Sequence, residues 1–159
     1  LKLYTDYHQR IVKSEAAAFH RKALVGEAPA LSFEAESVIK DGADILAINY
    51  LQALSERGNL LREFVQLVFA DADVLMLPVS LEEAPYYQPI TEKSSNEIDE
   101  EFFAASIFTR FVNFLGLPAV TLPTGLGENG MPTSIQVIAP PFDELMMLNL
   151  TIELESKLK

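Results

Sequence analysis

The stretch FTRFVNFLGLPAVTLPTGLGENGMPTSIQVIA, residues 108–139, contains the features that decide the fold. Gly116-Leu117-Pro118 ends a helical pattern, because glycine favours a helix C-terminus and proline cannot continue the helix. Two short apolar runs, Ala119–Leu122 and Ser134–Ala139, are typical of strands, and Asn129-Gly130 between them is typical of a hairpin turn. The predicted helix before Gly116 has one apolar side, which is formed by Phe103, Ile107, Phe111 and Phe114.

The rest of the chain continues this alternation of helices and short strands. Val74–Leu77 is apolar on both faces and is followed by a proline, which predicts a strand buried inside a sheet. Ser80–Asn96 is polar and rich in proline, which predicts a surface loop. Further helices are predicted at Leu3–Leu24, from the N-cap Ser32 to the C-terminal stop Gly42, from Asp44 to about Phe69, and at Asp143–Lys157. The alternation predicts an α/β fold, and we expect residues 1–159 to form a single domain.

The composition excludes several classes of function. The formal net charge is −11, whereas binding to nucleic acid or to an anionic membrane requires a basic surface. No apolar run approaches the roughly 20 residues of a membrane span, and no secretory signal opens the chain. The chain has no Cys and two His, which argues against disulfides and a zinc site. We expect a soluble, cytoplasmic protein and, because Leu1 rather than Met comes first, a processed chain or a part of a longer one.

Three short motifs have the residues of functional sites but lack the context that such sites need. Gly125–Gly130 has the glycine spacing of a dinucleotide-binding loop, but a strand rather than a helix is predicted after it. Lys93-Ser94-Ser95 contains the residue types of a Ser-Lys nucleophile pair, but nothing apolar surrounds it to lower the lysine pKa. His8 and His20 lie about 120° apart around one predicted helix, so they do not converge on a metal.

Two arginines fall on the apolar sides of their predicted helices. Arg57 lies four residues before Leu61, and Arg110 lies next to Phe111. One interpretation is that each side chain extends from the edge of the core to solvent or pairs with a carboxylate. The other is that both face a cleft and hold an anionic or carbonyl group with two hydrogen bonds. Sequence periodicity does not choose between them.

Several segments, taken in order along the chain, resemble those of one enzyme family. Residues 108–119, FTRFVNFLGLPA, resemble the helix-to-strand segment near the end of amidase-signature enzymes, and residues 73–78, DVLMLP, resemble the buried strand of that family. The resemblance continues through Tyr50–Ala53, Arg57, Leu122–Gly125, Asn129–Pro132, Ile135–Ile138, Phe142–Glu144 and Leu148. The ordered set is specific although its pieces are common. The chain is therefore identified as similar to the C-terminal portion of an amidase-signature enzyme.

The resemblance implies helices packed around a mixed β-sheet and an activity that hydrolyses C–N bonds of small amides without metal or organic cofactor. In the family, a nucleophilic Ser is activated by a second Ser that is paired with a Lys. Backbone N–H groups of a Gly- and Ser-rich segment hold the oxyanion. No such segment occurs in these 159 residues. No catalytic residue is therefore assigned here, and we expect the Ser-Ser-Lys triad on the N-terminal portion of the same enzyme.

The resemblance also implies a wall of the substrate pocket, formed by Arg57, Ser106, Thr109 and Arg110. In the family branch that draws ammonia from glutamine for tRNA-linked amidation, an Arg at position 57 and an Asp at position 106 hold the amino-acid head. This chain keeps the Arg but has Ser106. A neutral hydroxyl cannot pair with an ammonium group as a carboxylate does, which argues against glutamine as the substrate. Phe111 and Ser134 also depart from the family, where Pro and Gly are frequent.

Three hypotheses for the function follow. In the first, the chain is the substrate-pocket part of an amidase, with a small-molecule amide and the catalytic N-terminal portion as its partners. In the second, it is a non-catalytic binding or assembly module derived from an amidase, which could form a homo-oligomer. In the third, it is an independent hydrolase that uses Lys93, Ser94 or Ser95. A segment cut from a larger sheet exposes a strand edge and an apolar face, so the first hypothesis predicts self-association or a need for a partner.

Overall fold

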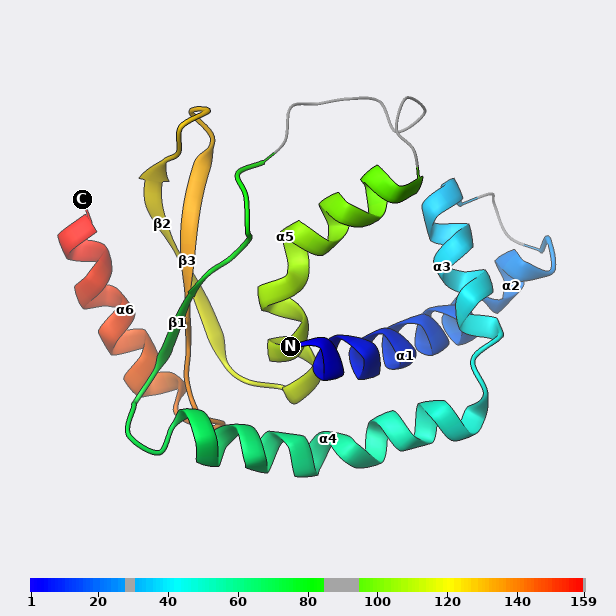
Figure 1. The fold of residues 1–159 in the computed structure, drawn as a ribbon, viewed down its shortest axis with the longest axis horizontal. Helices are drawn as coiled ribbons and strands as arrows, with labels where there is room; N and C mark the ends of the chain where they lie inside the picture. Colours follow the sequence, from blue (N-terminus) through cyan, green and yellow to red (C-terminus); the bar gives the residue numbers. More distant parts are fainter. Residues whose placement is uncertain (28–30, 85–94, 159) are drawn as a thin grey trace. The chain divides into compact units, whose positions relative to one another are not determined.

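The structure is a computed structural model that describes residues 1–27, 31–84 and 95–158 (Figure 1). The chain divides into two compact units, Leu1–Leu61 and Arg62–Lys159, and each is described here by itself. The expectation of a single domain stays a prediction. Most of the predicted loop Ser80–Asn96, including Lys93 and Ser94, lies outside the described residues.

The first unit consists of helices. α1 (Lys2–Phe19) contacts α3 (Phe33–Ala43), and the short α2 (Arg21–Leu24) contacts both. The predicted helix Leu3–Leu24 is thus divided at His20. The reason is a tighter turn, because the carbonyl of His20 accepts a hydrogen bond from the N–H of Ala23, three residues later. α4 (Ala47–Val68) starts in this unit and runs unbroken through Gly58-Asn59.

The sequence predicted the start of α3 correctly but not its end. Ser32 is the N-cap, as expected, and its hydroxyl accepts a hydrogen bond from the N–H of Ala35 at 3.3 Å. The assignment of Gly42 as the stop was wrong, because the helix includes it and ends at Ala43. Gly42 has a different function, since a Cβ at this position would overlap the carbonyl of Lys13 on α1. The glycine therefore allows the backbones of α1 and α3 to approach each other.

The second unit is built on a three-stranded antiparallel sheet in the order β1-β3-β2. β1 (Leu75–Pro78), β2 (Ala119–Leu126) and β3 (Pro132–Ile138) confirm the three predicted strands, and β2 and β3 form the predicted hairpin. The prediction that Val74–Leu77 lies inside a sheet is wrong for the described residues. β1 is an edge strand, and its Met76 is 44% exposed.

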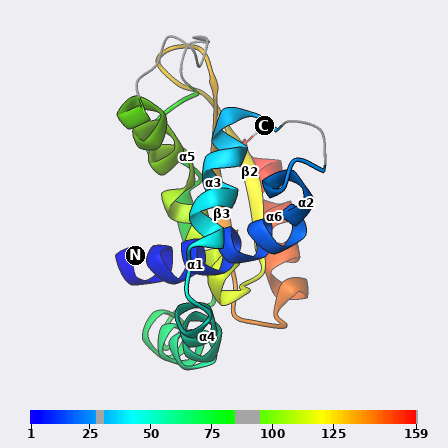
Figure 2. The same cartoon turned by 90° about the vertical axis from the view of Figure 1, so that its right-hand side faces the viewer.

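Helices α5 (Ser95–Leu115) and α6 (Glu144–Leu158) lie on opposite sides of this sheet (Figures 1 and 2). On the α6 side, the buried residues Leu122, Val137, Ala139 and Met147 form one cluster. On the α5 side, Phe111 and Leu115 are almost fully buried, and the ring of Phe111 lies 5.5 Å from that of Phe64. The predicted α/β architecture is confirmed. The described strands pair only antiparallel, whereas the family resemblance implies a mixed sheet for the complete fold.

The glycine-rich motif Gly125–Gly130 closes the β2–β3 hairpin. Gly127 donates a backbone hydrogen bond to the carbonyl of Met131 at 2.9 Å, and Gly130 takes a φ of 76° that favours glycine. Glu83 reaches this turn from the segment after β1, and its carboxylate accepts a hydrogen bond from the N–H of Asn129 at 3.1 Å. β3 follows the motif directly, so the helix that a dinucleotide-binding loop must open is absent from these described residues.

Candidate functional site

Three of the four predicted pocket residues lie on one turn of α5. Ser106, Thr109 and Arg110 are separated by three and four positions, which places their side chains on one side of the helix. All three are partly exposed. The next turn, by contrast, buries Phe111 and Phe114. The Ser106–Arg110 turn thus lies where α5 passes from a partly exposed stretch into the core.

The end of α5 is fixed by its C-terminal cap. Gly116 has a φ of 72°, and the N–H groups of Gly116 and Leu117 both donate to the carbonyl of Val112, at 2.9 and 3.1 Å. Leu115 and Leu117 on either side of the glycine are buried. The predicted stop at Gly116 is therefore confirmed, and it directs the chain from α5 into β2.

Hydrogen bonds from side chains hold two carbonyls of the Ser106–Arg110 turn. The hydroxyl of Thr109 donates to the carbonyl of Ser106 at 3.1 Å, so its proton points back along the helix. The carbonyl of Phe108 accepts a hydrogen bond from Nε2 of Gln136 at 2.9 Å. Nε2 of Gln136 also donates to the carbonyl of Pro78, at 3.3 Å. One amide group on β3 thereby links α5 to the end of β1.

Gln136 is a residue to which the sequence interpretation gave no function. It belongs to the stretch that resembles the family, but no contact followed from that resemblance. A signal was present in the sequence, because Gln136 is the polar residue in the apolar run Ile135–Ala139 of a predicted buried strand. Buried polar groups need hydrogen-bond partners, so such a residue has to bind something inside the fold.

Arg57, the fourth predicted residue, lies on α4 in the first unit. The buried residues of α4 include Ala53, Leu60 and Phe64, and helical periodicity places Arg57 on the same side. Its side chain is nevertheless exposed. This position agrees with the predicted location at the edge of an apolar stripe. Its function in substrate binding stays a prediction, as it does for Ser106, Thr109 and Arg110.

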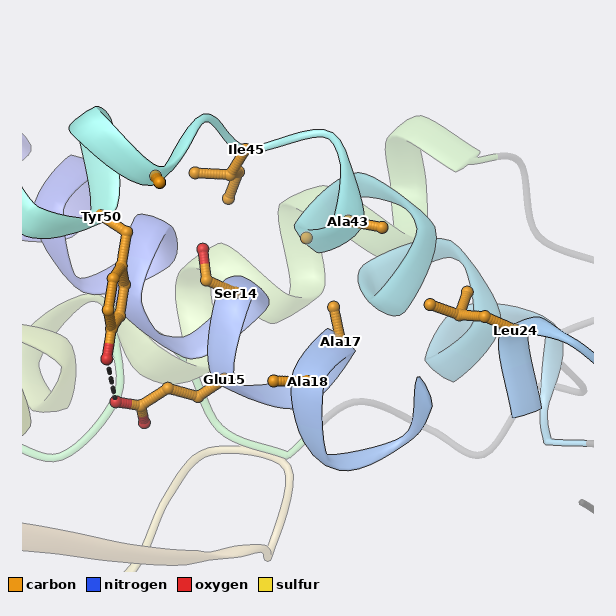
Figure 3. A pocket seen from close by; sticks show the side chains of 10 residues that line it. Ser14, Glu15, Ala17, Ala18, Leu24, Ala43, Ile45 and Tyr50 are labelled. Atoms are coloured by element: carbon orange, nitrogen blue, oxygen red, sulfur yellow. Dashed lines mark hydrogen bonds between the residues drawn. The ribbon is translucent and has the colours of Figure 1, made fainter. Parts of the chain in front are cut away.

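A hollow of about 450 Å³ in the first unit is lined by α1, by Leu24 of α2, by the end of α3 and by the start of α4 (Figure 3). Most of its lining is small or apolar, and Tyr50 and Glu15 form a polar pair on one side. The hydroxyl of Tyr50 donates to Oε1 of Glu15 at 3.2 Å. Desolvation, together with this hydrogen bond and the negative charge of Glu15, raises the pKa of Tyr50 above its ordinary value.

Other kinds of site find little support in the described residues. Among them, no group of three or more His, Asp or Glu side chains is arranged to hold a metal ion. None of the described helices is both long and apolar enough to cross a membrane. Ser95 begins α5, whereas its neighbours Lys93 and Ser94 lie in the part of the chain that the structure does not describe.

Comparisons with known proteins identify the family. The family model described as Amidase matches residues 3–148. A glutamyl-tRNA(Gln) amidotransferase subunit of Cupriavidus necator is 38% identical over 99 residues, which cover 62% of this chain and 19% of that protein. A crystal structure of an amidase matches with a TM-score of 0.82 and 28% identity, over 98% of this chain and 36% of that one. A structure of 6-aminohexanoate cyclic dimer hydrolase shares the fold, with a TM-score of 0.78 and 19% identity over 98% of this chain and 35% of that one.

The matches cover most of this chain but only a part of each relative. This chain spans about a fifth of the curated relative and about a third of the two solved structures. The family match, in contrast, extends over nearly all of this chain. The chain therefore belongs to the amidase signature family and corresponds to a part of the amidase fold.

Proposed function

We propose that this chain forms the substrate-pocket part of an amidase that hydrolyses C–N bonds of small amides. The observation that carries the proposal is the family match over residues 3–148. The Ser-Ser-Lys triad of this amidase lies outside the chain, on the N-terminal portion of the same enzyme. This location is supported by the sequence, which contains no Gly- and Ser-rich segment of the kind that holds the nucleophile and the oxyanion in this family.

In this proposal the Ser106–Arg110 turn forms a wall of the substrate pocket, and Arg57 on α4 is proposed separately as a substrate-binding residue. The partial exposure of Ser106, Thr109 and Arg110 supports this wall, because a side chain must be accessible to contact a substrate. Arg110 and Arg57 supply planar groups that hydrogen-bond a carbonyl or carboxylate oxygen. Since the hydroxyl of Thr109 donates to the carbonyl of Ser106, the oxygen of Thr109 is left to accept from a substrate N–H.

The charge at the proposed wall supports one class of substrate. The relatives include a glutamyl-tRNA(Gln) amidotransferase subunit. An amino-acid substrate carries an ammonium group, and the neutral hydroxyl of Ser106 pairs with it poorly. We therefore propose a small amide without an α-ammonium group rather than glutamine.

The catalytic portion is the proposed partner of this chain. Apolar side chains on the outer side of α6 support a partner, because Leu145, Leu148 and Ile152 are exposed at helical spacing. Another side of α6 buries Met147 in the cluster with Leu122 and Val137 of the sheet, and Thr151 is buried as well. A helix that is apolar on both sides is stable when both sides are covered, either by the rest of the enzyme or by a second copy of the chain. Native mass spectrometry distinguishes a different bound chain from a whole multiple of 17.7 kDa.

A fluorophosphonate probe, which labels activated serines, tests the proposal together with an assay of ammonia release from simple amides. We expect neither labelling nor turnover with this chain alone. In the complete enzyme, we expect labelling of a serine outside these 159 residues. Labelling of Ser94 or Ser95, or turnover that is lost when either becomes alanine, would overturn the assignment. A complete protein without label or turnover would instead favour the binding or assembly module.

A second measurement tests the wall itself in the complete enzyme. Arg110→Ala should raise KM for the amide about tenfold or more, because a charge-assisted hydrogen bond to the substrate is removed. Arg110→Lys should recover part of this loss, since lysine keeps the charge but not the paired donors. Arg21→Ala, at an exposed position on α2, serves as the control and should leave KM unchanged. Equal KM values for both alanine variants would remove Arg110 from the pocket.

A further inference from the structure

We propose that Gln136 is a positioning residue, which holds the Ser106–Arg110 turn of α5 at a fixed distance from the sheet. The inference rests on the proposed function of that turn as a wall of the substrate pocket. The observation behind it is the pair of hydrogen bonds from Nε2 of Gln136, to the carbonyl of Phe108 on α5 and to the carbonyl of Pro78 on β1.

The strand register explains why the side chain of Gln136 reaches α5. Gln136 is in the central strand, between Leu77 of β1 and Thr121 of β2. Successive side chains of a strand point to opposite faces of the sheet. Val137 and Ala139 belong to the cluster with Met147 of α6, so Gln136 points to the other face, towards α5. Neighbouring strands on both sides hold the backbone at this position and thus fix the Cα from which the side chain of Gln136 extends.

The burial of Gln136 makes its hydrogen bonds obligatory. The residue is 3% exposed, so water cannot replace a lost partner. An amide that is buried without hydrogen bonds is strongly unfavourable, and Nε2 carries two N–H donors for two acceptors. Both of its partners are backbone carbonyls on separate elements. α5 therefore cannot slide along the sheet near Phe108 without leaving a donor of Gln136 unpaired.

The position of Phe108 connects this constraint to the proposed pocket. Its carbonyl belongs to the same helical turn as Ser106, Thr109 and Arg110. A displacement of the carbonyl consequently moves the three side chains together. Misplacement of binding groups by about 1 Å can reduce activity about a hundredfold even when the catalytic groups are unchanged. Gln136 touches neither substrate nor nucleophile in this proposal, and it acts through the turn.

The test uses Gln136→Met in the complete enzyme, because methionine has a similar length but no N–H donor. Val137→Ala is the matched control, since it removes core packing from the same strand on the α6 face. Hydrogen exchange of the peptides that contain residues 106–111 reports how firmly the turn is held, without any need for activity. We expect this exchange to become about tenfold faster in Gln136→Met, the size of effect that corresponds to one hydrogen bond, and to stay unchanged in Val137→Ala.

Kinetics provide the second measurement. We expect Gln136→Met to raise KM for the amide severalfold, with no change in the rate of labelling by the fluorophosphonate, whereas Val137→Ala should change neither. Unchanged exchange in Gln136→Met would overturn the positioning proposal. Faster exchange with an unchanged KM would overturn its link to the pocket. If the unmodified enzyme has no amidase activity, the proposed function fails, and the exchange measurement alone decides whether Gln136 positions the turn.

Discussion

Replacement of Gly42 by alanine tests the close packing of α1 against α3. A Cβ at position 42 would overlap the carbonyl group of Lys13 and would lie 3.1 Å from Cβ of Ala17. The carbonyl is backbone, so relief requires the two helices to separate, and overpacking of this kind costs about 1–3 kcal/mol. Alanine is more favourable than glycine inside a helix by about 0.5–1 kcal/mol, which offsets part of that cost. The net expectation is a loss of about 1–2 kcal/mol of stability.

Gly58→Ala is a matched control for this experiment. Gly58 also lies inside a helix, α4, but apart from its chain neighbours and the backbone of its own helix no atom lies within 4 Å of the Cβ that alanine would add. Only the helix preference remains, so Gly58→Ala should stabilise the chain by about 0.5–1 kcal/mol. With an m-value of about 2 kcal/mol per molar urea, the two variants should differ by about 1 M or more in their unfolding midpoints. Far-UV circular dichroism during urea unfolding measures this difference. If Gly42→Ala is as stable as Gly58→Ala, the packing argument is wrong.

Three further predictions concern other contacts of the structure. Glu83→Ala should cost about 1 kcal/mol in urea unfolding, because the N–H of Asn129 loses its acceptor; an unchanged midpoint would show that this hydrogen bond contributes nothing. In an absorbance titration of the tyrosines, a component with a raised pKa should disappear in Tyr50→Phe and move down in Glu15→Gln. Because the folded-state pKa of Tyr50 is raised, its contribution to stability is present below the unfolded pKa near 10 and is lost as the pH rises above it. In the complete enzyme, Arg57→Ala should raise KM without lowering kcat, and unchanged kinetics would assign Arg57 a structural role.

The secondary structure could be predicted well from local signals. Ser32 and Gly116 mark the start of α3 and the end of α5, because capping depends on a few neighbouring residues. The Asn129-Gly130 turn was predictable for the same reason. The prediction for Gly42 failed because its signal is not local. A glycine near a helix end favours a stop, but here the residue serves contact with Lys13 on a helix that lies about 30 residues away in sequence.

The position of β1 at the sheet edge could not be predicted from its sequence. Val74–Leu77 is apolar throughout, which normally indicates strands on both sides. In the described residues a partner strand lies on one side only. An apolar pattern predicts that a segment will be buried. It does not predict which other part of the protein covers the segment. The same applies to the outer side of α6, which is apolar and exposed.

For the candidate site, the sequence placed Ser106, Thr109 and Arg110 on one helix turn, because helical periodicity fixes their spacing. It could not find the contact between Gln136 and the carbonyl of Phe108. That contact joins residues 28 positions apart and depends on which face of β3 is turned towards α5. One residue of difference in strand register would turn Gln136 to the α6 side.

The strand order also affects how the chain assembles during synthesis. β3 is the central strand, yet it is made after both of its neighbours, and Gln136 follows Pro78 by 58 residues. At about 5–20 residues per second, β1 leaves the ribosome roughly 3–12 s before its partner exists. During that time its backbone N–H and C=O groups lack β3, the strand that pairs with β1 in the described residues, and unpaired strand edges promote aggregation. The last strand to emerge thus completes both ladders of the sheet together, which makes the nascent chain dependent on protection until β3 appears.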